Sequence, residues 1–237
     1  VNAYNAEHPL EFYHFFRDNG CQYLQFTPIV ERLTEHEDGR TLASLADVGH
    51  KENQEITIAD FSVTPEQWGK FLCTIFDDWV RHDVGKIFVE IFDCTLANWV
   101  GVQPGICAYS KECGHAGVME HNGDVFSCDH FVFPEYKLGN IQDKSLIDML
   151  YGEKQQAFSR LKHTSLPRQC KECDMEFACH GECPKNRFEN DKYGEPGLNY
   201  LCKGYYEYYT HVAPYMDFMK RELQAQRPPA NIMNVLK

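Results

Sequence analysis

Eight of the eleven cysteines lie between residues 107 and 202, and they are the chain's strongest candidates for chemistry. Four of them form a short run, C-x2-C-x5-C-x3-C, which begins at Cys170 and ends at Cys183. Two-residue gaps let neighbouring thiolates converge on one metal centre from a single turn of the chain. Two sets of four thiolates would suit either two tetrahedral zinc sites or two four-iron clusters. The eight are Cys107, Cys113, Cys128, Cys170, Cys173, Cys179, Cys183 and Cys202.

Composition narrows the class of protein. The 237 residues carry 23 basic and 35 acidic side chains, a net charge of −12, which disfavours nucleic acid or an anionic membrane as a partner. The sequence contains no run of about 18 apolar residues, so it predicts no membrane span. The first residues show no export signal, which disfavours a disulfide framework and predicts a cytoplasmic protein with reduced cysteines.

The first hundred residues have the order of elements that is typical of parallel α/β structure. Thr64 opens one of the helices with a capping-box sequence, Thr-Pro-Glu-Gln. Two strands alone cannot close a barrel, so we expect a preceding part of the fold to lie outside this chain. Helices are predicted at 8–19 and 65–82, strands at 21–30 and 86–92, and a long loop at 31–60.

The second part of the chain has shorter elements. Residues 115–128 predict a β-hairpin that turns at Asn122-Gly123. Helices are predicted at 143–162 and 203–225, and the tail with Pro228-Pro229 is expected to be loose. Several isolated side chains are predicted to pack rather than to react, namely Cys21, Cys73, Tyr205, Tyr206, Tyr208, Tyr209 and Tyr215.

The complete cysteine pattern resembles the SPASM auxiliary-cluster domain of radical S-adenosylmethionine (SAM) enzymes. The matching residues are Cys113-x9-Gly123-x4-Cys128, the run that begins at Cys170, and a lone Cys202, with Cys107 as an eighth ligand. Residues 123–129 (GDVFSCD) and 138–141 (LGNI) resemble the anaerobic sulfatase-maturating enzymes in particular, and residues 23–26 and 91–93 do so more weakly.

This resemblance implies a fold in two parts. Residues 1–98 would be the C-terminal strands and helices of a partial (β/α) barrel, an α/β structure. Residues 99–237 would be the SPASM domain, a small α+β unit with a β-hairpin, helices and a closing C-terminal helix.

The resemblance also implies an activity. The full-length enzyme would oxidise a cysteine or serine of a sulfatase to Cα-formylglycine. Its partners would be a sulfatase polypeptide with a Cys/Ser-x-Pro-x-Arg segment and an electron donor such as flavodoxin or ferredoxin. The C-x3-C-x2-C motif of radical SAM enzymes is absent from this sequence. We therefore expect SAM and a third [4Fe–4S] cluster to be bound mainly by a preceding part, and this chain alone to be inactive.

The ligand sets implied by the resemblance are interleaved along the chain. The sequence spacing alone would instead group Cys170, Cys173, Cys179 and Cys183. Full cysteine ligation leaves no open iron position, which favours electron transfer over substrate binding. Cys107, Cys113, Cys128 and Cys183 would hold one [4Fe–4S] cluster near the active site, and Cys170, Cys173, Cys179 and Cys202 would hold an outer one.

The resemblance assigns roles to two further residues. Asp129, directly after a cluster ligand, would be the general base, although it could instead cap a turn or face water. Val30, at the end of the first predicted strand, would contact the SAM adenine, although it could instead be core. Asp93 and Cys94 are predicted to end the second strand, where a core or loop role is favoured over contact with substrate.

Two other functions stay open at this point. A SPASM maturase could act on a different peptide and form a thioether or a carbon–carbon crosslink. A zinc-bound interaction module with no chemistry would also use eight cysteines. The identity of the bound metal separates this last alternative from the first two.

Overall fold

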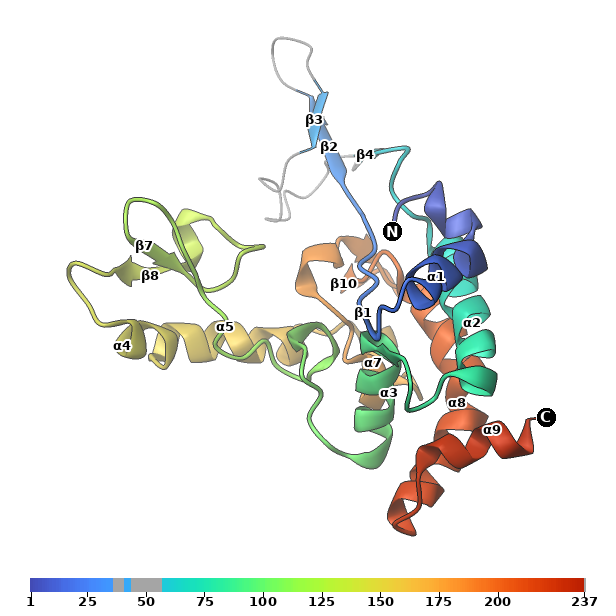
Figure 1. Cartoon of the computed structure of the whole chain (residues 1–237). Coiled ribbons are helices and arrows are strands. Elements are labelled where there is room, and N and C mark those ends of the chain that lie inside the picture. Colours follow the sequence, from blue (N-terminus) through green and yellow to red (C-terminus); the bar gives the residue numbers. More distant parts are fainter. Residues whose placement is uncertain (36–40, 44–56, 237) are drawn as a thin grey trace.

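The computed structural model describes residues 1–35, 41–43 and 57–236. Two parts lie beside each other in Figure 1: a helical body, made of residues 1–30, 63–100 and 202–236, and a cysteine-rich lobe, made of residues 101–201. The mixed α/β content predicted from the sequence is confirmed. Every helix within the described ranges is too short or too polar to cross a membrane.

The helical body contains the large apolar core. Its elements are η1 (Asn5–Glu7), α1 (Pro9–Asp18), β1 (Tyr23–Leu24), α2 (Pro65–His82), β5 (Phe88–Val89), α3 (Glu90–Val100), α8 (Cys202–Gln224), η5 (Pro229–Asn231) and α9 (Ile232–Val235). The helices predicted at 8–19, 65–82 and 203–225 are thereby confirmed to within one residue at each end.

Helix α2 begins where the capping box predicts. The Thr64 hydroxyl accepts a hydrogen bond from the Gln67 backbone N–H at 3.2 Å, and the Gln67 side chain accepts one from the Thr64 N–H at 3.1 Å. The helix buries Trp68, Phe71 and Phe76 completely. Their spacing puts them on one face, which is the physical reason for the amphipathic pattern in the sequence.

Helices α2 and α8 cross at two glycines. A Cβ on Gly204 would lie 2.2 Å from the Pro65 carbonyl oxygen, and a Cβ on Gly69 would lie 3.0 Å from the Gly204 Cα. The two backbones approach this closely only because neither residue has a side chain. Helix α8 thereby seals the core, with Tyr205, Tyr208 and Tyr209 buried, so their predicted packing role is confirmed. Tyr206, in contrast, is 47% exposed.

The strand predicted at residues 21–30 is much shorter in the structure. Only Tyr23 and Leu24 form a strand, β1, which pairs in parallel with Phe88 and Val89 of β5. The chain beyond Leu24 is extended in part, but a strand needs a hydrogen-bonded neighbour, and β5 provides one for two residues. The parallel pairing itself agrees with the predicted order of elements.

The strand predicted at residues 86–92 was wrong for its second half. Helix α3 starts at Glu90, directly after β5, and ends before Gly101, which adopts a left-handed conformation with φ of 77°. A short apolar run such as Ile91-Phe92 cannot be assigned to strand or helix by periodicity alone. Asp93 and Cys94 therefore lie in the first turns of α3 and do not end a strand.

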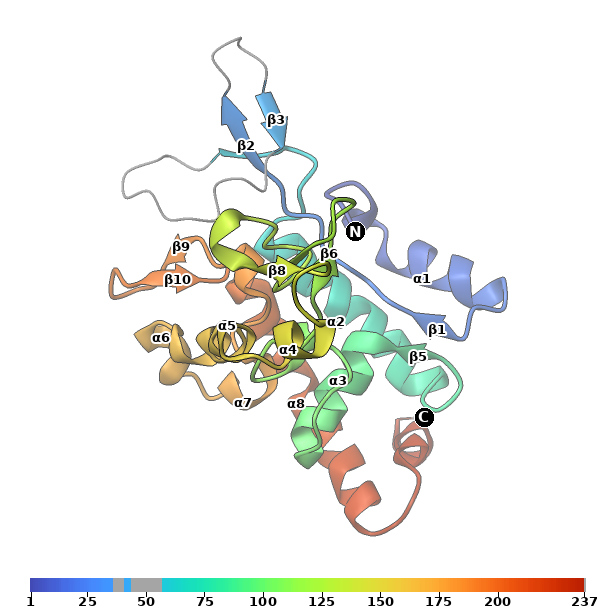
Figure 2. The ribbon, with the colours of Figure 1, turned by 90° about the vertical axis from the view of Figure 1, so that its left-hand side faces the viewer.

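The long loop predicted at residues 31–60 contains strands within its described residues. Figure 2 shows β2 and β3 as an arm that projects from the molecule. The strand β2 pairs in antiparallel fashion with both neighbours. Residues 36–40 and 44–56 of the predicted loop lie outside the described residues. The three strands are β2 (Arg32–Glu35), β3 (Thr41–Ala43) and β4 (Thr57–Ile58).

The cysteine-rich lobe is made of short elements. The predicted hairpin is confirmed: β6 and β7 pair in antiparallel fashion, and Gly123 in the turn has φ of 85°. Strand β8 adds a third strand beside β7. The elements are η2 (Cys107–Tyr109), β6 (Val118–Met119), β7 (Asp124–Phe126), η3 (Pro134–Tyr136), β8 (Lys137–Asn140), α4 (Leu146–Leu150), α5 (Glu153–Thr164), α6 (Arg168–Lys171), α7 (Glu176–Cys179), η4 (Pro184–Asn186), β9 (Glu189–Asn190) and β10 (Pro196–Leu198).

The helix predicted at residues 143–162 is two helices, α4 and α5. The break lies at Tyr151 and Gly152, and Gly152 has the extended backbone of an N-cap. A Cβ on Gly152 would lie 2.5 Å from the Asp148 carbonyl oxygen, so this tight turn favours glycine.

The C-terminal tail is packed and not loose, contrary to the prediction. Ile232, in α9, is buried in the core. The Glu222 carboxylate accepts hydrogen bonds from Arg227 and from Asn231 at 2.6 Å, which ties the tail to the end of α8. Prolines start this short helical segment because its first N–H groups have no intrahelical acceptor.

Candidate metal centres

Four of the eight cysteines line one cavity. Its volume is about 710 Å³, and it lies between α6, α7 and the first turn of α8. Burial raises the pKa of Cys170 to about 11. Burial and then the neighbouring thiols of Cys170 and Cys173 raise the pKa of Cys202 to about 12. The four cysteines are Cys170, Cys173, Cys179 and Cys202, called here the outer set.

The remaining four cysteines come from other segments, and Cys183 belongs with them. Burial raises the pKa of Cys183, and the thiols of Cys113 and Cys128 add to this rise. Cys113 in turn interacts with Cys107, which lies in η2. We call Cys107, Cys113, Cys128 and Cys183 the inner set. The run that begins at Cys170 is thus divided, because Cys183 does not line the outer cavity.

The turn after α7 separates Cys183 from the rest of its run. His180 and Glu182 both have positive φ, at 49° and 53°, and Gly181 between them has φ of 66°. Three successive residues thus have left-handed backbone conformations, which turn the chain. Only glycine adopts such a conformation without strain. Cys179 therefore ends its helix at the outer cavity, while Cys183 turns toward Cys113 and Cys128.

Helix α5 holds the segments that carry the inner set. The Ser159 carbonyl oxygen accepts a hydrogen bond from the Cys113 N–H at 3.3 Å, and the Ser159 hydroxyl accepts one from the Gly114 N–H at 2.9 Å. The Gln155 side chain donates to the carbonyl oxygens of Gly114 and Ser127 at 2.9 and 3.2 Å. One helix face thus fixes the backbone next to Cys113 and next to Cys128.

Two buried cations complete this framework. Lys162, 1% exposed, donates to the carbonyl oxygens of Cys107, Ala108 and Ser110. Arg187, 6% exposed, donates to four carbonyl oxygens, those of Lys162, His180, Gly181 and Glu182. Sequence reasoning missed Lys162, Arg187 and Gln155. A sequence signal was available for Gln155 and Lys162. Their spacing places both on the same face of α5 as Phe158, which indicates burial.

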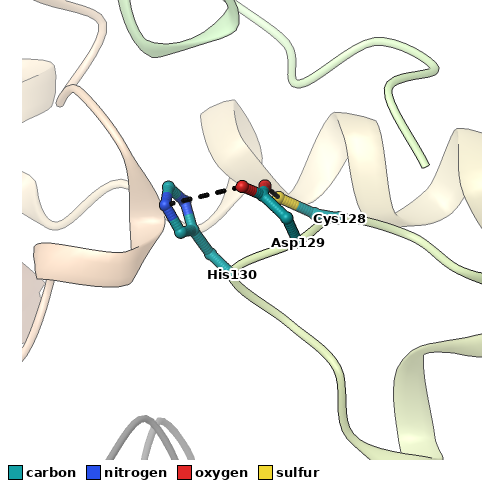
Figure 3. A group of neighbouring side chains, drawn as sticks. All are labelled: Cys128, Asp129 and His130. Atoms are coloured by element: carbon teal, nitrogen blue, oxygen red, sulfur yellow. Dashed lines mark hydrogen bonds and ion pairs between the residues drawn. The ribbon is translucent and has the colours of Figure 1, made fainter. Parts of the chain in front are cut away.

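Asp129 lies between a cysteine of the inner set and a histidine (Figure 3). The Cys128 thiol donates to its carboxylate at 3.2 Å, and the His130 ring lies 4.0 Å away. Partial burial acts to raise the pKa of Asp129, but the Cys128 hydrogen bond and His130 outweigh it and lower the pKa. The Asp129 side chain is 72% exposed, so its carboxylate is open to an incoming molecule.

His130 also contacts the inner set. Its Nδ1 atom lies 3.6 Å from the Cys183 sulfur. Burial raises the pKa of Cys128 to about 12, with a further contribution from Asp129. Metal binding must therefore include deprotonation of thiols whose pKa values are raised, because the ligand is a thiolate and not a thiol.

The other residues singled out in the sequence belong to the helical body. Val30 is 3% exposed and belongs to the apolar core of the helical body. Burial raises the pKa of Asp93 to about 6, and Cys94 is buried beside it in α3. Cys21 and Cys73 are half-buried and pack against the same core, so their predicted packing role is confirmed.

The spacing of the thiols bears on which metal they suit. Two thiolates on one zinc lie about 3.8 Å apart. Within the part of the chain that the structure describes, only Cys128, Asp129 and His130 bring three ligand atoms within 4.8 Å of one another. The outer cavity, about 710 Å³, has room for a multi-iron cluster.

Known proteins share this sequence and fold. Residues 111–174 match the family model of the iron-sulfur cluster-binding SPASM domain. The chain is 66% identical over 237 residues to a serine-type anaerobic sulfatase-maturating enzyme of Bacteroides thetaiotaomicron. The alignment covers 100% of this chain and 56% of that protein. A cysteine-type enzyme of Clostridium perfringens is 26% identical over 90% of the chain and 53% of its own length.

Solved structures agree with these sequence matches. The structure of native anSMEcpe with bound AdoMet superposes with a TM-score of 0.73 at 25% identity, over 93% of this chain and 55% of that one. The chain thus spans about half the length of the relatives that it matches. In sequence and in fold, the chain is similar to a part of the anaerobic sulfatase-maturating enzymes that contains the SPASM domain.

Proposed function

We propose that this chain holds two auxiliary [4Fe–4S] clusters in a radical SAM enzyme that oxidises a cysteine or serine of a sulfatase to Cα-formylglycine. The observation that carries the proposal is the division of the eight cysteines. Four line one cavity, and Cys183 interacts instead with Cys113 and Cys128. Two groups of four thiols are the donor set that two all-cysteine clusters require.

The ligand assignment follows this division. The inner set, Cys107, Cys113, Cys128 and Cys183, would hold the cluster near the substrate. The outer set, Cys170, Cys173, Cys179 and Cys202, would hold the second cluster. When bound, SAM and the iron-sulfur clusters supply hydrogen-atom abstraction from the substrate carbon and a path for one electron. All-cysteine ligation leaves no iron position for substrate, so the chain's own residues must bind and deprotonate it.

Asp129 is the proposed general base. An exposed aspartate is a carboxylate at neutral pH, and the Asp129 side chain is 72% exposed beside Cys128. A carboxylate there could take the proton of the substrate thiol or hydroxyl next to the site where the electron leaves. The His130 Nε2 atom lies 4.0 Å from the Asp129 carboxylate.

The remaining parts of the proposal rest on the resemblance. Residues 1–98 would complete a partial (β/α) barrel, whose strands include the parallel pair β1 and β5. Residues 99–237 would form the SPASM domain. Val30 would contact the SAM adenine, although its burial in the core is also what simple packing produces. The protein substrate would carry a Cys/Ser-x-Pro-x-Arg segment, and flavodoxin or ferredoxin would supply electrons.

The first test measures iron, sulfide and zinc after anaerobic reconstitution of the full-length protein. The two sets should contribute about 8 iron and 8 sulfide per chain. Cys179→Ser should remove one cluster and leave the other, while Cys73→Ser, outside both sets, should remove none. Zinc without sulfide, even after reconstitution, would contradict the proposal and leave an interaction module.

A second test addresses Asp129. Asp129→Asn keeps the shape and removes the base, so formation of formylglycine in a sulfatase peptide should fall by about 10²–10⁴-fold. The matched control is Asp174→Asn, which removes an exposed carboxylate beside Cys173 of the outer set. Unchanged turnover in Asp129→Asn with full iron content would remove Asp129 from the mechanism.

A further inference from the structure

Lys162 and Arg187 lie between the two sets of cysteines. Lys162 interacts with the thiols of Cys113 and Cys183, which belong to the inner set. Arg187 interacts with Cys170 and Cys179 of the outer set and also with Cys183 of the inner set. Arg187 donates to the Lys162 carbonyl oxygen at 2.5 Å, so the two residues form one continuous unit.

Lys162 is held as an ammonium. Its Nζ donates to three carbonyl oxygens, with distances of 2.5 Å to Cys107 and 2.7 Å to Ala108, and a third bond to Ser110. An ammonium has three N–H donors, whereas a neutral amine has two donors and a lone pair that a carbonyl oxygen would repel. Arg187 stays charged at any pH at which the protein folds.

Within residues 1–35, 41–43 and 57–236, neither cation has a carboxylate as a direct partner. All hydrogen bonds of Lys162 and Arg187 within the described residues run to backbone carbonyl oxygens. Glu182 is the carboxylate that interacts with both of them at longer range. It instead accepts hydrogen bonds from the Cys183 N–H and the Asn199 side chain, at 2.5 and 3.1 Å.

Two buried cations with one carboxylate nearby leave positive charge uncompensated. Burying an unpaired charge costs several kcal/mol even after the protein relaxes. Besides Glu182, the acidic groups near Lys162 are thiols of the inner set, and those near Arg187 are thiols of both sets. A [4Fe–4S] cluster with four thiolate ligands carries a net negative charge, so bound clusters would supply the charge that both cations lack.

We propose that Lys162 and Arg187 are the fixed counter-charges of the two clusters and set their reduction potentials. This inference rests on the proposed cluster ligation. Reduction adds one negative charge to a cluster, and a nearby cation stabilises that charge and so raises the potential. Arg187 raises the potential of both clusters, because it faces both sets. Lys162 acts chiefly on the cluster held by the inner set.

The test is an EPR-monitored redox titration of the reconstituted full-length protein. Arg187→Met should lower the reduced-to-oxidised ratio of both auxiliary clusters at a fixed potential about tenfold, which is about 59 mV for a one-electron couple. Lys162→Met should do so for the inner cluster and change the outer one less. Arg160→Met, an exposed residue on the same helix, is the control and should shift neither.

A second variant and a second readout keep the result interpretable. Lys162→Arg keeps the charge and should retain both iron content and potentials. With iron bound, Lys162→Met should be less stable to urea than Lys162→Arg, because only arginine keeps a positive charge beside the clusters. Equal stability of the two variants would contradict the inference.

The outcomes separate the two proposals. A wild-type protein that takes up no iron or sulfide contradicts the proposed function itself. Full iron content with wild-type potentials in both Met variants overturns the counter-charge inference and leaves the clusters in place. Loss of iron in Lys162→Met and equally in Lys162→Arg would assign Lys162 to backbone packing and would also overturn it.

Discussion

The helical body and the cysteine-rich lobe bury different kinds of groups. The body encloses large apolar side chains such as Trp68, Phe71 and Phe76. The lobe buries polar and charged groups, among them Gln155, Lys162 and Arg187, against backbone carbonyl oxygens. Hydrophobic burial stabilises the body directly, whereas a buried polar framework only offsets its own desolvation. We infer that the lobe depends on its clusters for stability and that the body does not.

The largest expected effect comes from removing iron. Chelation under anaerobic conditions should unfold much of the lobe, because the thiols lose the group that draws their segments together. Amide exchange should accelerate by orders of magnitude for amides such as Cys113 N–H, which binds Ser159. Amides of α2 should keep their protection.

Equal exchange in the lobe before and after chelation would contradict the inferred difference. The same would hold if α2 lost its protection together with the lobe. Restoring iron and sulfide should restore protection, which distinguishes cluster loss from damage by oxygen.

The second effect is expected in the body. Trp68→Ala should lower the free energy of unfolding by about 3–5 kcal/mol, because it opens a cavity where the side chain is 0% exposed. Trp68→Phe is the matched control. The Trp68 indole N–H has no hydrogen-bond partner among the described residues, so Phe removes no bond and should cost far less. Urea unfolding measures both.

Loss of iron in a folded Trp68→Ala protein would show that the two regions are more tightly coupled than we infer. The predicted result is lowered stability of α2 and α8 with unchanged iron content at low temperature.

A smaller effect is expected at the crossing of α2 and α8. Gly204→Ala places a Cβ 2.2 Å from the Pro65 carbonyl oxygen, a backbone atom that cannot move alone. We expect a loss of about 1–3 kcal/mol from overpacking, which exceeds the gain in helix propensity. Gly69→Ala should cost less, since the nearest atom to its Cβ is the mobile Glu207 carboxylate at 2.8 Å. A stabilising Gly204→Ala, measured by thermal unfolding, would refute the close approach.

The smallest effect concerns the start of α2. Thr64→Ala removes the hydroxyl that accepts from the Gln67 N–H and keeps the backbone N–H that donates to the Gln67 side chain, with an expected loss of about 1 kcal/mol. Thr64→Ser keeps the hydroxyl and should be nearly neutral. Neither variant should change iron content, and a drop in iron would link this helix start to the lobe.

Local patterns predicted several parts of this protein well. The capping box at Thr64 and the apolar stripe behind it located α2, because both signals arise within a few turns of the chain. The hairpin turn at Asn122-Gly123 was predicted for the same reason. Ile91-Phe92 was assigned wrongly, since a short apolar run fits a strand or a buried helix equally well.

The candidate site was also predicted only in part from the sequence. The types and spacing of eight cysteines predicted metal binding from the sequence alone, and the resemblance predicted the similarity to sulfatase-maturating enzymes. Spacing alone would have placed Cys183 with Cys170, since it measures distance along the chain. The left-handed turn at His180-Gly181-Glu182 directs Cys183 elsewhere, and that turn was not predicted.

The sequence by itself determined the donor atoms, their number and the helices of the body, because these depend on residue type and short periodicity. The tertiary structure decided which thiols share a cavity and which cations face them. Lys162 looks like an ordinary helix-surface lysine until α5 packs against the carbonyl oxygens of residues 107–110. Those oxygens come from a segment more than fifty residues earlier, and only the folded chain brings them to one nitrogen.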